Sequence, residues 1–136
     1  MTVDPLARMV GLPGGTFQMG SEDPGGYPSD GEGPIREVRL SPFRISATTA
    51  TNNEFAAFAA ATGHHTTAED EGWSYVFAGH LPDEFPDTRG VVGAEWWRQV
   101  FGADWRHPEG PGSDLADRAD HPVVQVSWFD AVAFAT

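Results

Sequence analysis

The chain has 136 residues, no cysteine and a formal net charge of −12, from 20 acidic and 8 basic residues, and every basic residue is arginine. Its 40% hydrophobic and 12% aromatic content indicates one folded domain at most and excludes a disordered chain. The acidic charge disfavours nucleic acid and anionic membranes as partners, the lack of cysteine excludes disulfides and thiolate metal sites within this chain, and no apolar run approaches the ~20 residues that span a bilayer.

The first residues, MTVDPLARMVGLPGG, lack the basic start and apolar middle of a signal peptide. The expected location is therefore the cytoplasm. A basic peptide or a cation is the partner most compatible with the charge of the chain.

Four short strands are expected in the first third of the chain. Met9–Leu12 and Thr16–Met19 flank the sequence LPGG, where proline and paired glycines impose a bend. Residues 20–34 form an acidic loop whose spacing does not match a helix–loop–helix calcium site, so it is interpreted as a solvated surface loop. Arg36–Leu40 alternates charged and apolar residues as a half-buried strand does, and Phe43–Ser46 is expected to form another strand.

A helix is predicted after Thr51, because Thr51 and Glu54 fit a capping box. Gly63 supplies the stop signal of this helix. One face of the helix is expected to carry Phe55, Phe58, Ala59 and Thr62.

The middle of the chain reads as turn, strand and loop. Residues 69–72 are predicted to form a turn, and residues 73–77 (WSYVF) a short aromatic strand. From Gly79 to Gly93 the pattern is typical of a loop, since Pro82 and Pro86 interrupt any regular periodicity.

The stretch from Ala94 to Trp128 holds four of the five tryptophans and is rich in Gly, Pro and Asp, with almost no helical or strand periodicity. Aromatic rings bury a large area and Gly and Pro fix turns, so this stretch is expected to be an ordered irregular segment that its rings hold on a core. Ordered loops of this kind commonly present binding or catalytic surfaces.

The end of the chain is predicted to be a strand followed by a helix. Val123–Val126 is an apolar strand candidate, and Ser127 with Asp130 fits a second capping box. The sequence ends at Thr136 without a helix stop signal, so a truncated helix is expected.

Five histidines raise the possibility of a metal site, namely His64, His65, His80, His107 and His121. None has the spacing of a known ligand signature, and surface or hydrogen-bonded histidines are the favoured interpretation. A site in which His107 and His121 converge with Asp104, Asp117 or Asp120 is left open.

The acidic residues do not reveal an acid–base pair. The expected roles of Asp114, Asp117 and Asp120 are turn capping and pairing with Arg106 or Arg118. No serine lies in a nucleophile-elbow pattern. For the tryptophans two readings stay open, since they can anchor a core or line a peptide-binding groove.

Three segments together resemble the formylglycine-generating enzyme (sulfatase-modifying factor) family. They are MVGLPGGTFQMGS, TNNEFAAFAAATGHHTTAEDEGWSYVF and AEWWRQVFGADWRHPEGPGSDLADRADHPVVQVSWFDAVAFAT, and the last is the most specific. Residues 9–136 resemble the N-terminal part of the family domain, after an N-terminal extension of residues 1–8. The chain departs from the common pattern at His64, where Tyr is frequent, and at Gln125, where His often precedes Val-Ser-Trp.

The resemblance implies an α+β, C-type-lectin-like fold with little regular secondary structure, here truncated. Enzymes of the family oxidise a cysteine in the Cys-x-Pro-x-Arg motif of sulfatases to Cα-formylglycine with molecular oxygen, at a copper ion that two thiolates hold. Calcium ions are also typical of the complete domain. The metal ligands would lie beyond Thr136, so neither metal nor catalytic residues are expected in this chain, and it is expected to be an inactive portion of the enzyme.

The partner that the resemblance implies is a sulfatase polypeptide, and the negative charge suits a motif that ends in Arg. The candidate substrate-binding residues are Glu95, Trp96, Trp97 and Trp105. Two alternatives remain, a non-catalytic lectin-like binding module and the C-terminal domain of a sulfoxide synthase. The second is disfavoured because only about eight residues precede the first strand.

Overall fold

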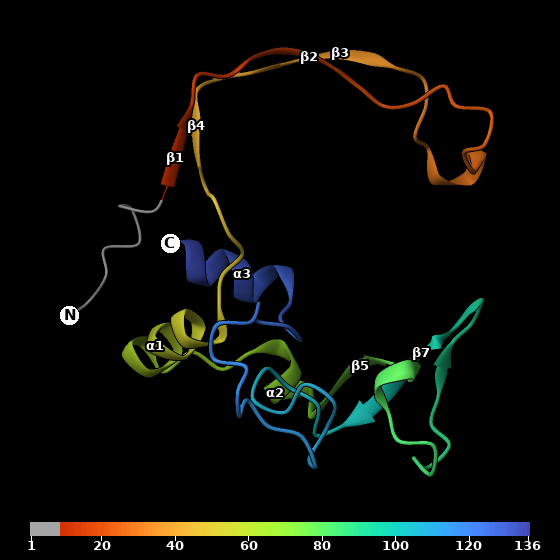
Figure 1. The fold of residues 1–136 in the computed structure, drawn as a ribbon, viewed down its shortest axis with the longest axis vertical. Coiled ribbons are helices and arrows are strands. Elements are labelled where there is room, and N and C mark those ends of the chain that lie inside the picture. The colour runs from red at the N-terminus through yellow and green to blue at the C-terminus, as the bar shows by residue number, and fades with distance from the viewer. Residues whose placement is uncertain (1–8) are drawn as a thin grey trace. The chain divides into compact units, whose positions relative to one another are not determined.

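The computed structural model describes residues 9–136 and has mixed α and β structure. It divides into two compact units, Met1–Thr48 and Thr49–Thr136. The expected extension, residues 1–8, lies outside the described residues. Figure 1 shows both units as a ribbon.

The first unit is a two-stranded antiparallel ribbon in two segments (Figure 1). Its elements are β1 (Met9–Leu12), β2 (Gly15–Met19), the 3₁₀ helix η2 (Pro28–Asp30), β3 (Arg36–Leu40) and β4 (Phe43–Ser46). β1 pairs with β4 and β2 with β3, so the four predicted strands are confirmed. The LPGG sequence joins two consecutive strands that pair with other partners. Gly14 is needed there, because its φ is +75° and a Cβ would lie 2.4 Å from the carbonyl oxygen of Leu40.

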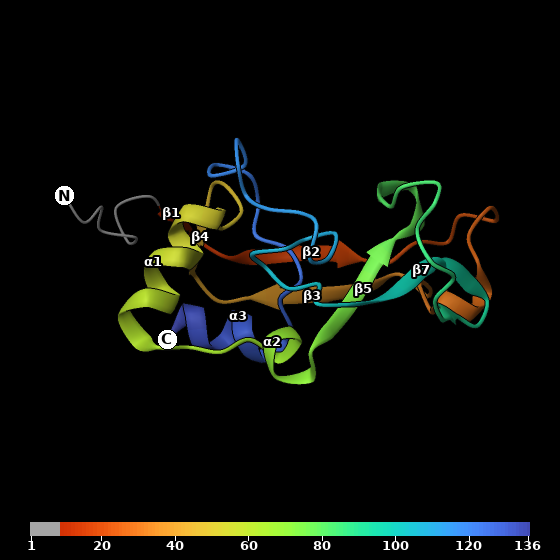
Figure 2. The same cartoon turned by 90° about the horizontal axis from the view of Figure 1, so that it is seen from below.

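The second unit combines helices with a three-stranded antiparallel sheet of order β5–β7–β6. Its elements are α1 (Asn52–Thr62), α2 (Thr67–Glu71), β5 (Trp73–Phe77), the 3₁₀ helix η3 (Ala78–His80), β6 (Gly90–Val91), β7 (Ala94–Phe101) and α3 (Trp128–Ala135). Figure 2 shows β5 and β7 running next to each other, in agreement with their pairing from Trp73 opposite Phe101 to Phe77 opposite Trp97.

The predicted helix boundaries at Thr51 and Gly63 are confirmed. The Thr51 side chain accepts from the Glu54 N–H, and the Glu54 carboxylate accepts from the Thr51 N–H at 2.9 Å. Gly63 adopts a left-handed conformation (φ 69°) and its N–H donates to Ala59 O. These contacts satisfy backbone groups that the helix itself leaves unpaired.

The turn predicted at residues 69–72 is wrong, because α2 begins at Thr67 and continues to Glu71. Thr66 caps this helix and forms a complete capping box with Glu69. The sequence signal of Thr followed three residues later by Glu was present, but the helix is too short to show an apolar face.

Two further predictions about the last third of the chain are wrong. The opening of the Trp-rich stretch is the eight-residue strand β7, whose exposed and buried positions do not alternate by residue type because tryptophans occupy both faces. Residues 123–126 form no strand. Gln125 has a φ of 58°, which turns the backbone out of the extended region that a strand needs.

Two small clusters form the core of the second unit. One consists of Phe55, Ala59 and Trp105, against which Phe134 of α3 packs, and the other of Val76, Val100 and Ala103. The ring centroids of Phe55 and Phe134 lie 5.9 Å apart. Each helix and the sheet therefore bury one face in a shared interior, as layered α+β domains do.

Backbone hydrogen bonds, more than tryptophan rings, hold the irregular segment before α3. The N–H groups of Asn52 and Asn53 in the first turn of α1 donate to His121 O (2.9 Å) and Ala119 O (3.0 Å). The Asn52 side chain donates to Arg118 O at 2.8 Å. Of the four tryptophans in the stretch only Trp105 is buried, so the expectation that the rings pin the whole segment is corrected.

Within residues 9–136, no helix has the length and apolarity that crossing a membrane would require.

Candidate functional site

A concavity of about 310 Å³ lies where α2, β5 and the segment before α3 meet. Three hydroxyl residues contribute to its wall, Thr67, Ser74 and Ser127. Its other lining residues are Ala68, Glu71, Trp73, Tyr75, Gln125 and Val126. Ligand sites combine apolar walls with a few placed polar groups, and this pocket has that composition.

Aromatic side chains continue from the pocket across one face of the sheet. Trp73, Tyr75 and Phe77 alternate along β5 and so share a face, and the register puts Phe101 and Trp97 of β7 opposite the first and last of them. We call these five residues the aromatic face. The Trp73 and Tyr75 rings meet edge to face at 5.1 Å and the Phe77 and Trp97 rings at 6.0 Å.

The aromatic face is open to solvent over much of its area. The exposed fraction is 46% for Tyr75, 43% for Trp97 and 66% for Phe101. Contiguous exposed apolar surface of this kind marks an interaction site more often than a random part of a surface, and aromatic rings bind extended peptides with little loss of conformational entropy.

Carboxylates border this surface. Glu71 lines the pocket, and strand alternation puts Glu95 on the same side of β7 as Trp97. The pKa of Glu95 is held below its ordinary value by hydrogen bonds from its own N–H and the Gly93 N–H. Glu95 is thus negatively charged at neutral pH, and the surface offers anionic groups next to aromatic rings.

Gln125 and Ser74 connect the walls of the pocket. The Ser74 hydroxyl donates to Gln125 Oε1 at 2.6 Å, and Gln125 Nε2 donates to Pro108 O at 2.8 Å. β5 is thereby tied through one side chain to the Trp-rich segment.

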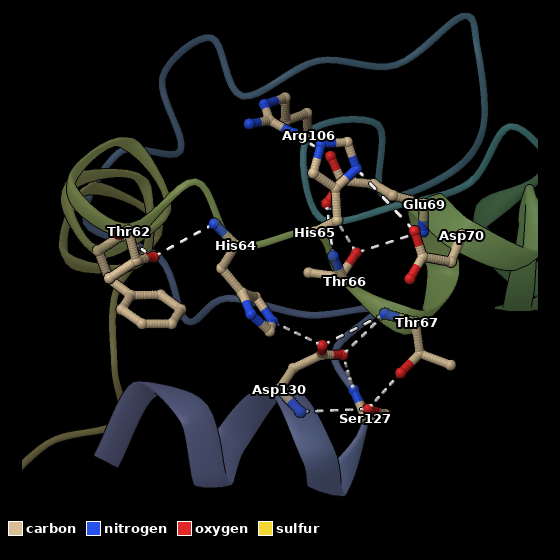
Figure 3. A network of polar contacts seen from close by, with 11 residues as sticks. Thr62, His64, His65, Thr66, Thr67, Glu69, Asp70, Arg106, Ser127 and Asp130 are labelled. Atoms are coloured by element: carbon tan, nitrogen blue, oxygen red, sulfur yellow. Dashed lines mark hydrogen bonds and ion pairs between the residues drawn. The ribbon is translucent and has the colours of Figure 1, made fainter. Parts of the chain in front are cut away.

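A buried carboxylate lies directly behind the pocket, at the start of α3 (Figure 3). Asp130 accepts from the Ser127 N–H (2.7 Å), from the Thr67 N–H (3.2 Å) and from His64 Nε2 (2.9 Å). Burial by itself would raise the pKa of Asp130, but the hydrogen bonds from Ser127, His64 and Thr67 outweigh it and hold the pKa below its ordinary value. Thr67 Oγ1 and Ser127 Oγ, which line the pocket, lie 2.7 Å apart.

A second carboxylate, Glu69, organises the other side of α2. It accepts from the Thr66 N–H and hydroxyl, both at 2.9 Å, and pairs with Arg106 (Figure 3). Burial would raise the pKa of Glu69, but the Thr66 hydrogen bonds and the Arg106 charge lower it further than burial raises it. Arg106 also stacks 4.2 Å above the Trp105 ring, so this ion pair connects α2 to the Trp-rich segment.

The four predicted substrate-binding residues lie in different environments. Trp105 is only 3% exposed and packs edge to face against Phe55 at 5.2 Å, which makes it a core residue. Glu95 and Trp97 lie on the side of β7 that carries the aromatic face, and Trp96, which is 52% exposed, points to the opposite side. None of the four lines the pocket.

The histidines do not gather around a metal site. In the described part of the chain, no three His, Asp or Glu side chains form a group that could hold a metal ion. His107 does meet Asp104, at 3.1 Å, within a tight turn in which Asp104 also accepts from two backbone N–H groups. The predicted acidic partners of Arg106 and Arg118 are corrected, since Glu69 and Glu109 pair with them.

Sequence reasoning missed Thr67, Ser74 and Gln125, which form most of the polar wall. Ser74 was read only as part of a strand, and Gln125 only as a departure from a pattern. The one available signal was the second capping box at Thr66 and Glu69, which would have located the start of α2 and hence Thr67.

The pocket and the aromatic face define a chain built to hold an extended peptide, and sequence comparison then gives the family. Residues 1–136 match the family described as "Sulfatase-modifying factor enzyme 1-like domain". The chain belongs to this family. It is 57% identical over 129 residues to a protein of Thermomonospora curvata named "Formylglycine-generating enzyme", which covers 94% of this chain and 43% of that protein.

Mammalian proteins are also similar. A Bos taurus protein with the name "Formylglycine-generating enzyme" is 46% identical over 134 residues, 97% of this chain and 36% of its own length. Another, "Inactive C-alpha-formylglycine-generating enzyme 2", is 45% identical over 93% of this chain and 42% of its own length. The chain thus spans about two fifths of the length of these relatives, and identity alone does not separate the active name from the inactive one.

Proposed function

We propose that the protein is a formylglycine-generating enzyme, which oxidises the cysteine of a Cys-x-Pro-x-Arg motif in a sulfatase polypeptide to Cα-formylglycine with O2. Membership of the family supports this proposal, as do the names of the most similar relatives. The 136 residues would supply one wall of the peptide site rather than the oxidising centre.

The observation that carries the peptide-binding role is the continuity between the pocket and the aromatic face. Trp73 and Tyr75 belong to both, so an extended peptide in the pocket would pass over rings that favour proline and aliphatic groups. Glu71 and Glu95 lie along the same path and suit an arginine side chain. Trp97 is the predicted residue that contributes most directly to this wall.

The residues of this chain do not fit the copper ion that the family uses. Copper(I) prefers soft thiolate ligands, and the sequence has no cysteine. Calcium would need a cluster of oxygen ligands, and residues 9–136 contain no group of acidic or histidine side chains that could hold it. We therefore assign to these residues only the binding and orientation of the peptide.

Three finer statements belong to the same proposal. The fold is the C-type-lectin-like variant of the family, with residues 9–136 as the N-terminal part of the domain. Its α+β composition is consistent with that assignment. The cytoplasm stays the predicted location, and the chain by itself is predicted to be inactive.

The test is conversion of a synthetic sulfatase peptide that contains Cys-x-Pro-x-Arg by the full-length protein, supplied with copper(I) and O2. Mass spectrometry should detect an aldehyde in place of the thiol. A peptide in which Ala replaces the arginine should be converted less efficiently, through a higher KM, if the carboxylates bind that residue.

Two outcomes would overturn parts of this account. No conversion by the full-length protein, under conditions in which a known family enzyme is active, would place it with the inactive relatives. Conversion by the 136-residue chain alone would show that the missing thiolates are not required, and the proposed division between peptide wall and oxidising centre would be wrong.

A further inference from the structure

Gln125 lies in the wall of the pocket in a backbone conformation that side chains other than glycine rarely adopt. Its φ is 58°, in the left-handed region. Such strain persists only where the surrounding contacts over-determine the conformation, and it concentrates at functional sites. The side-chain contacts of Gln125 identify what the conformation achieves.

The orientation of the Gln125 amide follows from its partners. The carbonyl oxygen of Pro108 can only accept a hydrogen bond, so the NH₂ group of Gln125 must face it, at 2.8 Å. The amide oxygen is then turned toward Ser74 Oγ, at 2.6 Å. Because an amide oxygen has no hydrogen to give, Ser74 is the donor in that contact.

A serine hydroxyl has one hydrogen and two lone pairs. Gln125 takes the hydrogen of Ser74, which leaves the lone pairs of Ser74 Oγ as acceptors, and both residues line the pocket. A free serine hydroxyl would rotate between donating and accepting, whereas this one is fixed as an acceptor.

The position of Ser74 indicates which donor it would meet. Ser74 lies between Trp73 and Tyr75 on β5, and β5 is an edge strand of the sheet, in the order β5–β7–β6. Extended peptides bind next to sheet edges through their main-chain groups, and the N–H groups are the donors that every peptide carries.

We propose that Gln125 is a positioning residue that fixes the Ser74 hydroxyl as an acceptor for one backbone N–H of an extended substrate peptide. This inference rests on the proposed function, in that the ligand is the sulfatase peptide. It adds a particular contact to that function and a role for a residue at which the chain departs from its family pattern.

The test uses the full-length protein and a non-reacting peptide in which Ser replaces the cysteine of the motif. Calorimetry measures its affinity, and a set of peptides replaces each backbone N–H in turn by an ester oxygen. In the wild type, one ester should weaken binding about tenfold, the effect of one lost hydrogen bond.

Ser74→Ala should weaken binding of the parent peptide by the same factor of about ten, and the sensitive ester should then have no further effect. Gln125→Met, which keeps the size of the side chain but neither hydrogen bond, should behave like Ser74→Ala. The double variant should bind no more weakly than Ser74→Ala alone. Ser113→Ala is the matched control, because Ser113 bonds within its own turn and does not line the pocket.

Distinct results would overturn the inference. An ester scan with no sensitive position, or one whose sensitive position stays sensitive in Ser74→Ala, would exclude the contact while leaving the proposed function intact if the peptide still binds. Additive losses in the double variant would show that Gln125 does not act through Ser74. Absence of peptide binding by the wild type would overturn the proposed function and this inference together. If Gln125→Met fails to fold, Ser74→Ala and the ester scan still decide.

Discussion

His64 Nε2 donates a hydrogen bond to Asp130 Oδ1 across 2.9 Å, and this contact joins the segment that follows α1 to the first turn of α3. Since the pKa of Asp130 is held low by its hydrogen bonds, the carboxylate is ionised and only accepts, so the hydrogen must be on Nε2. The same carboxylate accepts from the Thr67 N–H, and the start of α2 is thereby fixed as well.

Replacing His64 by Ala should destabilise the protein by about 1–2 kcal/mol, because Asp130 is buried and would lose one of its partners. The measurement is urea unfolding of the full-length protein at pH 7. His65→Ala is the control, since the His65 side chain is 74% exposed and its loss should change the free energy of unfolding by less than ~0.5 kcal/mol. Equal effects of the two variants would show that the His64 contact does not stabilise the fold.

The free energy of unfolding should fall as the solution is acidified below about pH 4. The pKa values of Asp130 and Glu69 are both lower in the folded protein than their ordinary values, which are about 3.9 and 4.3. The stabilisation is therefore fully present above those values and is lost as the pH falls through the lower, folded-state values. Chemical unfolding between pH 7 and pH 3 measures this slope.

Asp130→Asn should be less stable than the wild type at pH 7 and show a shallower loss of stability below pH 4. The reason is that the amide no longer binds a proton in this range, and its NH₂ group cannot accept from the Ser127 N–H. A slope identical to that of the wild type would mean that other carboxylates control the acid response.

Removing the Thr66 hydroxyl should destabilise the protein through the start of α2. Thr66 is buried and forms the capping box with Glu69, and the loss of such a cap costs about 1–2 kcal/mol. Thr66→Val keeps the shape and removes the hydroxyl, whereas Thr66→Ser keeps the hydroxyl. Thermal unfolding should rank Val below Ser, and the reverse order would show that the buried methyl group matters more than the cap.

The two neighbouring tryptophans of β7 provide a matched test of the aromatic face. Trp97 shares this face with Phe77, and Trp96 points to the other side of the strand. Trp97→Ala should raise the KM for the sulfatase peptide several-fold, as the loss of a binding contact does, and Trp96→Ala should leave it unchanged. Similar increases from both variants would mean that the peptide does not distinguish the two faces.

The predictability of this fold depended on local signals. Thr51, Gly63 and Ser127 were correctly identified as helix-capping residues because capping depends on residues three or four apart. The pairing of β1 with β4 was not predictable from the strand patterns, since register is set between residues about 35 positions apart. Residues 123–126 failed because the left-handed φ of Gln125 is imposed by tertiary contacts, which override strand propensity.

The candidate site was predictable only in part, for a related reason. Trp97 and Glu95 were found because aromatic and acidic residues stand out in a sequence. The hydroxyl groups of Thr67, Ser74 and Ser127 have ordinary residue types, and what distinguishes them is that α2, β5 and the start of α3 meet. Trp105 shows the converse, because its residue type suggested a surface role and its neighbours bury it.

The most direct test of the account is to locate the bound peptide. A sulfatase peptide with a photoreactive group in place of the residue before its arginine is irradiated with the full-length protein, and mass spectrometry identifies the cross-linked residues. The account predicts cross-links within residues 71–75, at Trp97 or within residues 125–127, which an excess of unlabelled peptide suppresses. Suppressible cross-links found only outside these residues would contradict the assignment of the pocket and the aromatic face as the peptide wall.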